Sequence, residues 1–396
     1  MIAPAGPAGR VELADIVRAH AGQLIGCSPT QRHVLQAIAD CRTAALGGHR
    51  RECPQCGHQE IAYNSCRDRH CPKCQGLEAA RWMDAQQRDL LPVPYFHVVF
   101  TVPAELHALF RAAPRVTYHL LFAAVAETLA QVARRRLGAQ IAFTAILHTW
   151  TQLLLLHPHL HCIVPGGGLD PGHTHWISTR ADFFLPVRIL TGVFRGKLLA
   201  ALEQAIDRAE IPPGPNADDR HVLLKRAAEQ RWVVYCKPPF AGPEQVLAYL
   251  ARYTHRIALS NDRLVSLHEG QVTFRWKDRA HGNAPRLATV AAETFLRRFL
   301  LHVLPPRFVR IRHYGWLANS ARQRLLPTVR EVLGLSATRA SAPLAVAPDT
   351  WEATLLRLTG KDVTRCPWCG AGGFLIVAVV PARAEPGDVA RRGRSP

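Results

Sequence analysis

Two C-x2-C pairs near the N-terminus constrain the fold of this chain more than any other feature. Cys53-Pro-Gln-Cys56 and Cys71-Pro-Lys-Cys74 are separated by 14 residues, and each pair has a proline in its tight turn. Two such pairs can place four thiolates at the corners of a tetrahedron, which is the geometry of structural zinc sites. The spacing therefore predicts one structural Zn²⁺ bound by Cys53, Cys56, Cys71 and Cys74.

A second group of metal-ligand side chains is interleaved with these cysteines. Cys66 and His70 have the C-x3-H spacing of one helical turn, and a second zinc ion bound here would cross-brace the first. In the alternative interpretation Cys41 is only a buried cysteine of a helix, and His49 and His70 contact phosphate or solvent. The candidate ligands of the second zinc ion are Cys41, His49, Cys66 and His70.

A third C-x2-C pair, Cys366-Pro-Trp-Cys369, lies near the C-terminus without a partner pair close to it in the sequence. It is weak evidence for a metal site of its own. The opening stretch "MIAPAGPAGRVELADIV" lacks the pattern of a secretory signal, and no apolar run approaches the ~18 residues that span a bilayer. We therefore expect a cytoplasmic protein with no membrane partner, whose 11 cysteines bind metal rather than form disulfides.

The charge of the chain points to a polyanionic partner. Its 396 residues hold 49 Lys and Arg against 30 Asp and Glu, a formal net charge of +19, and 48% of them are hydrophobic. A chain of this length should form two or three domains with real cores. The excess of basic residues favours nucleic acid as the partner, although a bias of the genome toward arginine codons would raise the charge as well.

Periodicity predicts a mixture of helices and strands. Helices are expected over residues 11–46, 77–90, 104–137, 187–209 and 242–259. Strands are expected over residues 95–103, 141–150, 153–164 and 231–240, with a hairpin over 263–278 that turns at His268-Glu269-Gly270. Residues 285–335 mix helix with a basic segment, and the tail from residue 381 is expected to be disordered.

Three histidines alternate along one predicted strand, in "LLLLHPHLHCIV". Side chains alternate across a strand, so His157, His159 and His161 share one face and can hold a divalent ion against the sheet. Pro158 limits the regularity of the strand at its start, which makes His159 and His161 the stronger pair. A third ligand would complete the site and leave positions open for a phosphate oxygen. The candidates for it are His148 on the preceding strand, Gln152 and His157.

The predicted helix over residues 242–259 carries tyrosines on its polar side. On a helical wheel the apolar residues gather on one side, whereas Tyr249, Arg252, Tyr253 and Arg256 gather on the other. This pattern also fits an ordinary amphipathic surface. A tyrosine that attacks a phosphodiester nevertheless needs such a setting, because cationic neighbours hold the phosphate beside the phenol.

Together these motifs resemble those of a known superfamily. "HPHLHCIVPGGGL" followed by "YLARYTHR" is similar to the catalytic pair of the HUH endonucleases. The cysteine block over residues 41–75 and "RFLLHVLPPRFVRIRHYGWLAN" resemble the two-tyrosine, rolling-circle insertion-sequence transposases of the IS91 family. The resemblance covers roughly residues 30–320 in the same order.

The resemblance implies an α+β fold, with an HUH-type antiparallel sheet, helices packed on it and a helical zinc-binding module before it. We expect a zinc-binding domain for DNA recognition over residues 1–100, a catalytic domain over 101–335, and an extension with a C-x2-C pair and a disordered tail over 336–396. In such a family His159 and His161 bind Mg²⁺ or Mn²⁺, and His148 is the favoured third ligand. Tyr249 and Tyr253 would be the nucleophiles.

The resemblance also implies a reaction. One tyrosine would attack single-stranded DNA at an element end and form a 5′-phosphotyrosyl link, while Arg252 or Arg256 steadies the phosphate. No ATP-binding motif is expected, and no G-x4-G-K-[ST] sequence is present. Basic side chains would contact DNA phosphates, or they form an ordinary solvated surface. These candidates are Arg50, Arg51, Arg67, Arg69, Arg310 and Arg312.

Two other functions fit part of the sequence. A non-enzymatic zinc-ribbon DNA-binding regulator would need the charge and the cysteines but neither the histidines nor the tyrosines. A relaxase or replication initiator would share the tyrosine chemistry but act at a plasmid origin, and the cysteine block argues against it.

Overall fold

The chain forms two compact α+β units. The computed structural model describes residues 10–87, 89–180, 182–212, 219–237, 258–278, 281–335, 350–360 and 362–383. The first unit combines residues 1–82, 255–303 and 346–396, and the second combines residues 83–254 and 304–345. Each unit is thus built from segments that are far apart in the sequence, and the C-terminal segment belongs to the same unit as the N-terminal one.

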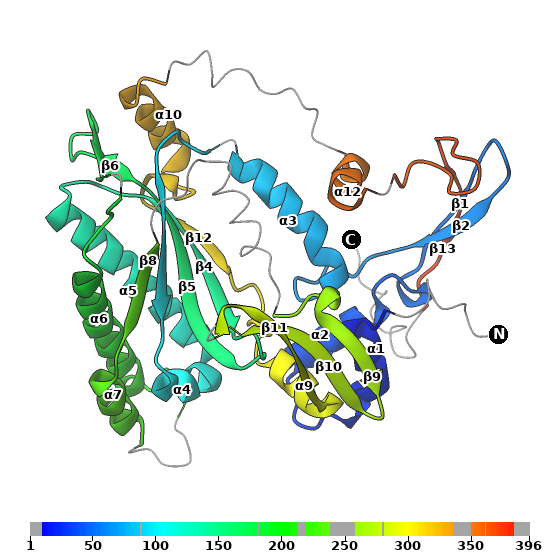
Figure 1. The fold of residues 1–396 in the computed structure, drawn as a ribbon, viewed down its shortest axis with the longest axis horizontal. Helices are drawn as coiled ribbons and strands as arrows, with labels where there is room; N and C mark the ends of the chain where they lie inside the picture. Colours follow the sequence, from blue (N-terminus) through cyan, green and yellow to red (C-terminus); the bar gives the residue numbers. More distant parts are fainter. Residues whose placement is uncertain are drawn as a thin grey trace, which may run out of the picture. The chain divides into compact units, whose positions relative to one another are not determined.

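A five-stranded antiparallel sheet forms the frame of the second unit (Figure 1). Its order is β12-β4-β5-β3-β8, so the strand of the three histidines is central and pairs with both β4 and β3. The predicted antiparallel sheet with its two neighbouring histidine-bearing strands is thereby confirmed. The strands are β3 (Tyr95–Thr101), β4 (Phe143–Trp150), β5 (Leu156–Pro165), β8 (Val233–Lys237) and β12 (Ile311–Tyr314).

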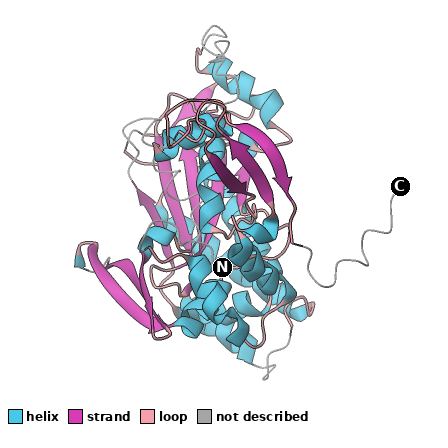
Figure 2. Ribbon diagram, turned by 90° about the vertical axis from the view of Figure 1, so that its right-hand side faces the viewer, coloured by secondary structure: helices cyan, strands magenta, loops and turns pink. Residues whose placement is uncertain are grey.

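Helices cover one face of this sheet (Figure 2). Phe100 on β3 and Leu160 on β5 belong to a buried cluster with Phe122 on α5 and Phe194 on α6. Alternation along each strand sends every second side chain to the other face. The helices of this unit are α4 (His107–Ala112), α5 (Pro114–Arg136), α6 (Val187–Asp207), α7 (Asp219–Glu229) and α10 (Arg322–Val332). Short elements join them: η3 (Ala104–Leu106), β6 (Gly167–Leu169), β7 (Trp176–Ser178) and η6 (Gly315–Leu317).

Helix α5 is long and apolar enough, by length and composition alone, to cross a membrane. The sequence showed no uninterrupted apolar run of this length, because polar residues such as His119 and Glu127 interrupt this segment. Packing accounts for the apolar character of the helix, because Leu121, Phe122, Val125 and Leu129 are fully buried in the core of the unit. More than half of the apolar window, 56%, is buried within the protein, as expected of a core helix.

The first unit contains two small antiparallel sheets with helices around them. One sheet has the order β13-β1-β2 and the other β11-β10-β9. The helices are α1 (Leu13–His20), α2 (Pro29–Asp40), most of α3 (Pro72–Gln87), α9 (Ala292–Leu300) and α12 (Trp351–Thr359), with the short turns η1 (Ala21–Gln23), η2 (Ala44–Leu46) and η4 (Asn261–Arg263). The strands are β1 (Gly48–Glu52), β2 (Gln59–Tyr63), β9 (Leu264–His268), β10 (Gln271–Asp278), β11 (Ala284–Ala291) and β13 (Leu375–Val380).

Local sequence signals explain several of these boundaries. Helix α2 begins after Ser28, whose hydroxyl accepts a hydrogen bond from the amide of Gln31, while Pro29 occupies the first helical position. Helix α3 starts at Pro72, five residues before the predicted start, so a proline again occupies the first helical position. The predicted hairpin over residues 263–278 is confirmed, whereas residues 284–291 form a strand that was not predicted.

Candidate functional site

His159 and His161 of β5 lie on the face of the sheet opposite the core helices α5 and α6. Leu160 and Cys162 point into the hydrophobic core, so the alternate residues His159 and His161 point away from it. The pairing of β4 with β5 places His148 directly across from His159. Sheet register thus brings a histidine from the neighbouring strand to the histidine pair.

His148, His159 and His161 form one cluster. One ligand nitrogen from each lies within 4.8 Å of the other two. The ring centres of His148 and His161 are 4.4 Å apart, and those of His159 and His161 are 4.8 Å apart. His157 stays outside this cluster and meets the ring of His107 edge-on at 6.0 Å. Of the two histidine candidates for a third ligand, the structure therefore brings His148 and not His157 into this cluster.

Hydrogen bonds select the ligand nitrogen on two of the rings. Nδ1 of His159 lies 2.6 Å from the carbonyl oxygen of His157, and Nδ1 of His161 lies 2.8 Å from Nε2 of His97. With Nδ1 engaged, Nε2 is the atom that each ring offers to a metal. Metal-binding histidines characteristically use their second ring nitrogen in this way.

His97 is a candidate site residue that the sequence interpretation missed. It lies on β3, is 2% exposed, and its ring is nearly coplanar with that of His161, at a centroid distance of 5.0 Å. Burial, together with the positive charge of Lys237, lowers the pKa of His97 to about 3. The neutral ring can accept a hydrogen bond from Nδ1–H of His161. The available signal was its odd-numbered position in "YFHVVFT", which puts it on the histidine face.

The cluster fits a divalent metal ion. Nitrogens bound at about 2.1 Å to one ion lie at most about 4.2 Å apart, so small rotations of the rings close the 4.8 Å set around an ion. Three imidazoles leave coordination positions for water or phosphate oxygen. The predicted nucleophile segment, with Tyr249, Arg252, Tyr253 and Arg256, lies outside the described residues.

The cysteines form two clusters of four in the first unit. Sγ of Cys74 lies 3.6 Å from Sγ of both Cys41 and Cys66, at the start of α3. The first cluster is Cys41, Cys66, Cys71 and Cys74, and the second is Cys53, Cys56, Cys366 and Cys369. In the second cluster the amides of Cys56 and Gln55 lower the pKa of the Cys53 thiol to about 7, which favours the thiolate that zinc binds.

The predicted cysteine grouping differs from this arrangement. Cys53 and Cys56 lie together with the C-terminal pair rather than with Cys71 and Cys74, because β13 pairs along β1 and brings the C-terminal pair beside them. The predicted second quartet is also divided. Cys41 and Cys66 join the first cluster, whereas His49 and His70 belong to neither, and Nδ1 of His70 lies 3.0 Å from a carboxylate oxygen of Asp68.

Among the six candidate DNA-binding arginines, Arg51 and Arg312 lie over aromatic rings. Arg51 pairs with Glu60 and lies over the ring of Phe374 at 4.8 Å. Arg312 lies over the ring of Phe122 at 4.0 Å.

The other four differ in exposure. Arg50 and Arg67 are exposed, whereas Arg69 and Arg310 are half-buried. Burial lowers the pKa of Arg69.

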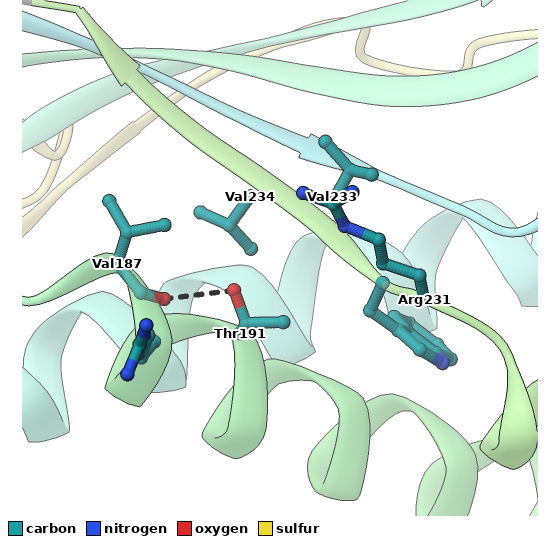
Figure 3. A pocket seen from close by; sticks show the side chains of 7 residues that line it. Val187, Thr191, Arg231, Val233 and Val234 are labelled. Atoms are coloured by element: carbon teal, nitrogen blue, oxygen red, sulfur yellow. Dashed lines mark hydrogen bonds between the residues drawn. The ribbon is translucent and has the colours of Figure 1, made fainter.

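A shallow pocket lies where α6 begins beside β8 (Figure 3). Arg188 and Arg231 line it together with Val233 and Val234, and Thr191 Oγ1 donates a hydrogen bond of 2.8 Å to the carbonyl of Val187. No histidine or cysteine lines this pocket, so the metal-ligand chemistry of the described residues is found in the clusters instead.

Comparisons with known proteins agree with the two kinds of cluster. The family described as "Putative transposase" matches residues 142–324, and the family described as "Transposase zinc-binding domain" matches residues 15–102. No solved structure matches the chain.

Two relatives are similar over most of their length. "Putative transposase y4qJ" of Sinorhizobium fredii is 48% identical over 382 residues, covering 93% of this chain and 95% of the relative. "Transposase for insertion sequence element IS801" of Pseudomonas savastanoi pv. phaseolicola is 29% identical over 339 residues, covering 84% of this chain and 80% of the relative. The chain therefore belongs to the IS91 family of transposases, DNA-binding enzymes with an N-terminal zinc-binding domain.

Proposed function

We propose that this transposase cleaves and rejoins single-stranded DNA at the ends of an insertion sequence through a 5′-phosphotyrosine intermediate. The observation that carries the proposal is the cluster of His148, His159 and His161, in which two rings have Nδ1 engaged and offer Nε2 as a ligand atom. The cluster lies on the sheet face opposite the core helices α5 and α6.

In the proposed reaction a tyrosine of the segment over residues 242–259 is the nucleophile. The phenolic oxygen of Tyr249 or Tyr253 forms a bond to the scissile phosphorus, and the bond from phosphorus to the 3′-oxygen breaks. The phenolic proton leaves the tyrosine, and a proton is taken up by the departing 3′-oxygen, so the products are a 5′-phosphotyrosine and a 3′-hydroxyl. The reverse attack by a 3′-hydroxyl restores a phosphodiester without ATP.

The side chains of the cluster would position the scissile phosphate. A divalent ion, Mg²⁺ or Mn²⁺, supplies Lewis-acid polarisation of the phosphate when it is bound to the three imidazoles. Arg252 or Arg256 would add positive charge where negative charge develops in the transition state. Two tyrosines would allow one DNA end to stay covalently bound while a second strand is attacked, which strand transfer requires.

The first unit would recognise the DNA end. Its exposed Arg50 and Arg67 are suited to phosphate contacts, as is the less exposed Arg310 of the second unit. Arg51 and Arg312 would act mainly through the packing contacts that they make.

The test is an adduct assay on single-stranded DNA from the ends of the element, with Mn²⁺ present. We expect wild-type protein to form an SDS-stable protein–DNA adduct. The variant that combines Tyr249→Phe with Tyr253→Phe should form none, because phenylalanine has no nucleophilic oxygen. His159→Ala and His161→Ala should each lower the rate of adduct formation by about 100-fold or more, since polarisation of the phosphate is lost.

Matched controls distinguish the chemistry from a loss of fold. Tyr118→Phe removes the hydroxyl of a core tyrosine, and His175→Ala removes an exposed imidazole that is not in the cluster. Both should form adduct at the wild-type rate. An adduct that persists in the double tyrosine variant would refute the nucleophile assignment, and wild-type rates in His159→Ala would refute the metal assignment.

A further inference from the structure

We propose that a second zinc ion closes a ribbon built from two distant parts of the chain, residues 48–63 and 362–380. Its ligands are the Cys53 and Cys56 pair and the Cys366 and Cys369 pair. The C-terminal pair lies far beyond residues 15–102, which the zinc-binding family covers. The zinc module of this transposase is therefore completed by its C-terminal segment.

The sulfur positions in this cluster match tetrahedral zinc. Sγ of Cys53 lies 3.6 Å from Sγ of Cys369, and Sγ of Cys56 lies 3.7 Å from Sγ of Cys366. Four sulfurs bound at about 2.3 Å to one tetrahedral ion are about 3.8 Å apart. A disulfide would require a separation of about 2.05 Å, so these distances describe thiol ligands rather than oxidised pairs.

The two cysteine pairs have the same backbone structure, which is the strongest evidence for a shared role. In the first, the amide of Cys53 donates to the carbonyl of His58 at 2.9 Å, and the amide of Gly57 donates to Cys53 at 3.0 Å. In the second, the amide of Cys366 donates to the carbonyl of Ala371 at 2.7 Å, and the amide of Gly370 donates to the carbonyl of Cys366 at 2.9 Å.

The sequences of the two turns explain this match. Both read C-P-x-C-G, and the glycines have φ angles of +67° at Gly57 and +76° at Gly370, a region that favours glycine. The pair at Cys71 has glutamine at the equivalent position and leads directly into helix α3 instead. The two C-P-x-C-G turns are therefore matched in sequence and backbone geometry, as expected of two turns that bind one ion.

Contacts beside the cysteines hold the two parts in register. Strand β13 pairs antiparallel with β1, and the ring of His58 stacks on that of Trp368 at 6.3 Å. Arg51 donates a hydrogen bond of 3.4 Å to the carbonyl of Val363 and lies over Phe374.

Hydrophobic burial contributes little to this ribbon. Leu375, Ile376 and Val379 on β13 are exposed by 57%, 63% and 71%. A small sheet without a buried apolar face is marginal on its own, and metal binding commonly supplies the missing stability. The zinc ion should therefore add to the backbone pairing of β1 with β13 the stability that apolar burial does not supply.

The two zinc sites should differ in how readily they lose metal. In the first cluster Cys41 and Cys71 are at most 1% exposed, whereas Cys56 and Cys369 of the ribbon are exposed to solvent. A chelator reaches an exposed thiolate site more easily. The ribbon zinc should therefore leave first.

The proposal is tested by counting zinc in the full-length protein with inductively coupled plasma mass spectrometry. Wild type should contain two zinc ions per chain, one for each cluster of four cysteines. The variant that combines Cys366→Ser with Cys369→Ser should contain one. Cys369→His should keep two, because imidazole also binds zinc. Cys27→Ser, a cysteine outside both clusters, is the matched control and should keep two.

A second measurement uses wild-type protein only and does not depend on the folding of a variant. EDTA is added while zinc release and hydrogen exchange are followed together. Release of the first zinc ion should remove exchange protection from β13 and leave α2 protected. The proposal is overturned by a wild-type content of one zinc ion, by two zinc ions in the double serine variant, or by release that leaves β13 protected.

Discussion

At the scale of single residues, the histidine cluster depends on which nitrogen of each imidazole carries the proton. For Nε2 of His161 to bind a metal, Nδ1 must carry the proton, and this proton points to Nε2 of His97 at 2.8 Å. His97 can accept it because burial keeps its own ring neutral. His159 reaches the same state through a backbone carbonyl. One ligand is thus oriented by the main chain and the other by a buried side chain.

We expect His97→Leu to weaken Mn²⁺ binding by about 10-fold or more, since loss of the partner that orients a metal ligand typically costs 10–100-fold in affinity. Leucine fills much of the same volume but accepts no hydrogen bond. His97→Gln restores an acceptor and should bind Mn²⁺ more tightly than His97→Leu. Isothermal titration with Mn²⁺ measures both, with His175→Ala as the control. Equal affinity in wild type and His97→Leu would show that His97 does not orient the ligand.

At the scale of the elements, alternation in the sequence predicted the histidine strand, because every second residue of β5 enters one core. The pairing of β4 with β5 followed from two adjacent apolar segments, and it brought His148 to the pair. His97 was not predicted, since a single histidine in an apolar strand has no partner visible along the chain.

The cysteine grouping could not be read from spacing for a related reason. Spacing along the sequence reports local turns, whereas Cys53 and Cys369 meet across 316 residues through the pairing of β1 with β13. The shared pattern C-P-x-C-G was the only local sign of that contact. The sequence thus identified most of the clustered cysteines, but not which of them lie together.

A glycine directly after β12 allows a test of how much the close packing of the chain at this edge of the sheet contributes to stability. Gly315 has a φ angle of +64°, and an added methyl group would overlap the carbonyl oxygen of Ile141. Gly315→Ala should lower the free energy of unfolding by about 2–5 kcal/mol, from backbone strain of about 1–2 kcal/mol and the steric overlap. Gly138 has a similar φ of +72° with open space around it, so Gly138→Ala should lose only the strain energy. Denaturant unfolding measures both, and equal losses would rule out the overlap.

At the scale of the whole molecule, the two kinds of metal-ligand cluster are divided between the two compact units. Both cysteine clusters fall within residues 1–82 and 346–396, and the histidine cluster falls within residues 83–254. The second unit is held by a large apolar core that includes β3, β5, α5 and α6. The first has smaller sheets, one of them largely exposed. Zinc should accordingly matter far more to the stability of the first unit than to that of the second.

This division predicts a selective response to complete removal of zinc. After exhaustive chelation, hydrogen exchange should become fast in β1, β2 and α2, because the cysteine clusters that tie these elements to their neighbours are lost. Protection of β3, β4 and β5 should stay within about twofold of its starting value, because their buried side chains supply the stability. Cys71→Ser, which opens only the first cluster, should affect α2 more than β13. Simultaneous loss of protection in β5 would mean that the histidine sheet needs the zinc module to stay folded, and the two units would then unfold as one.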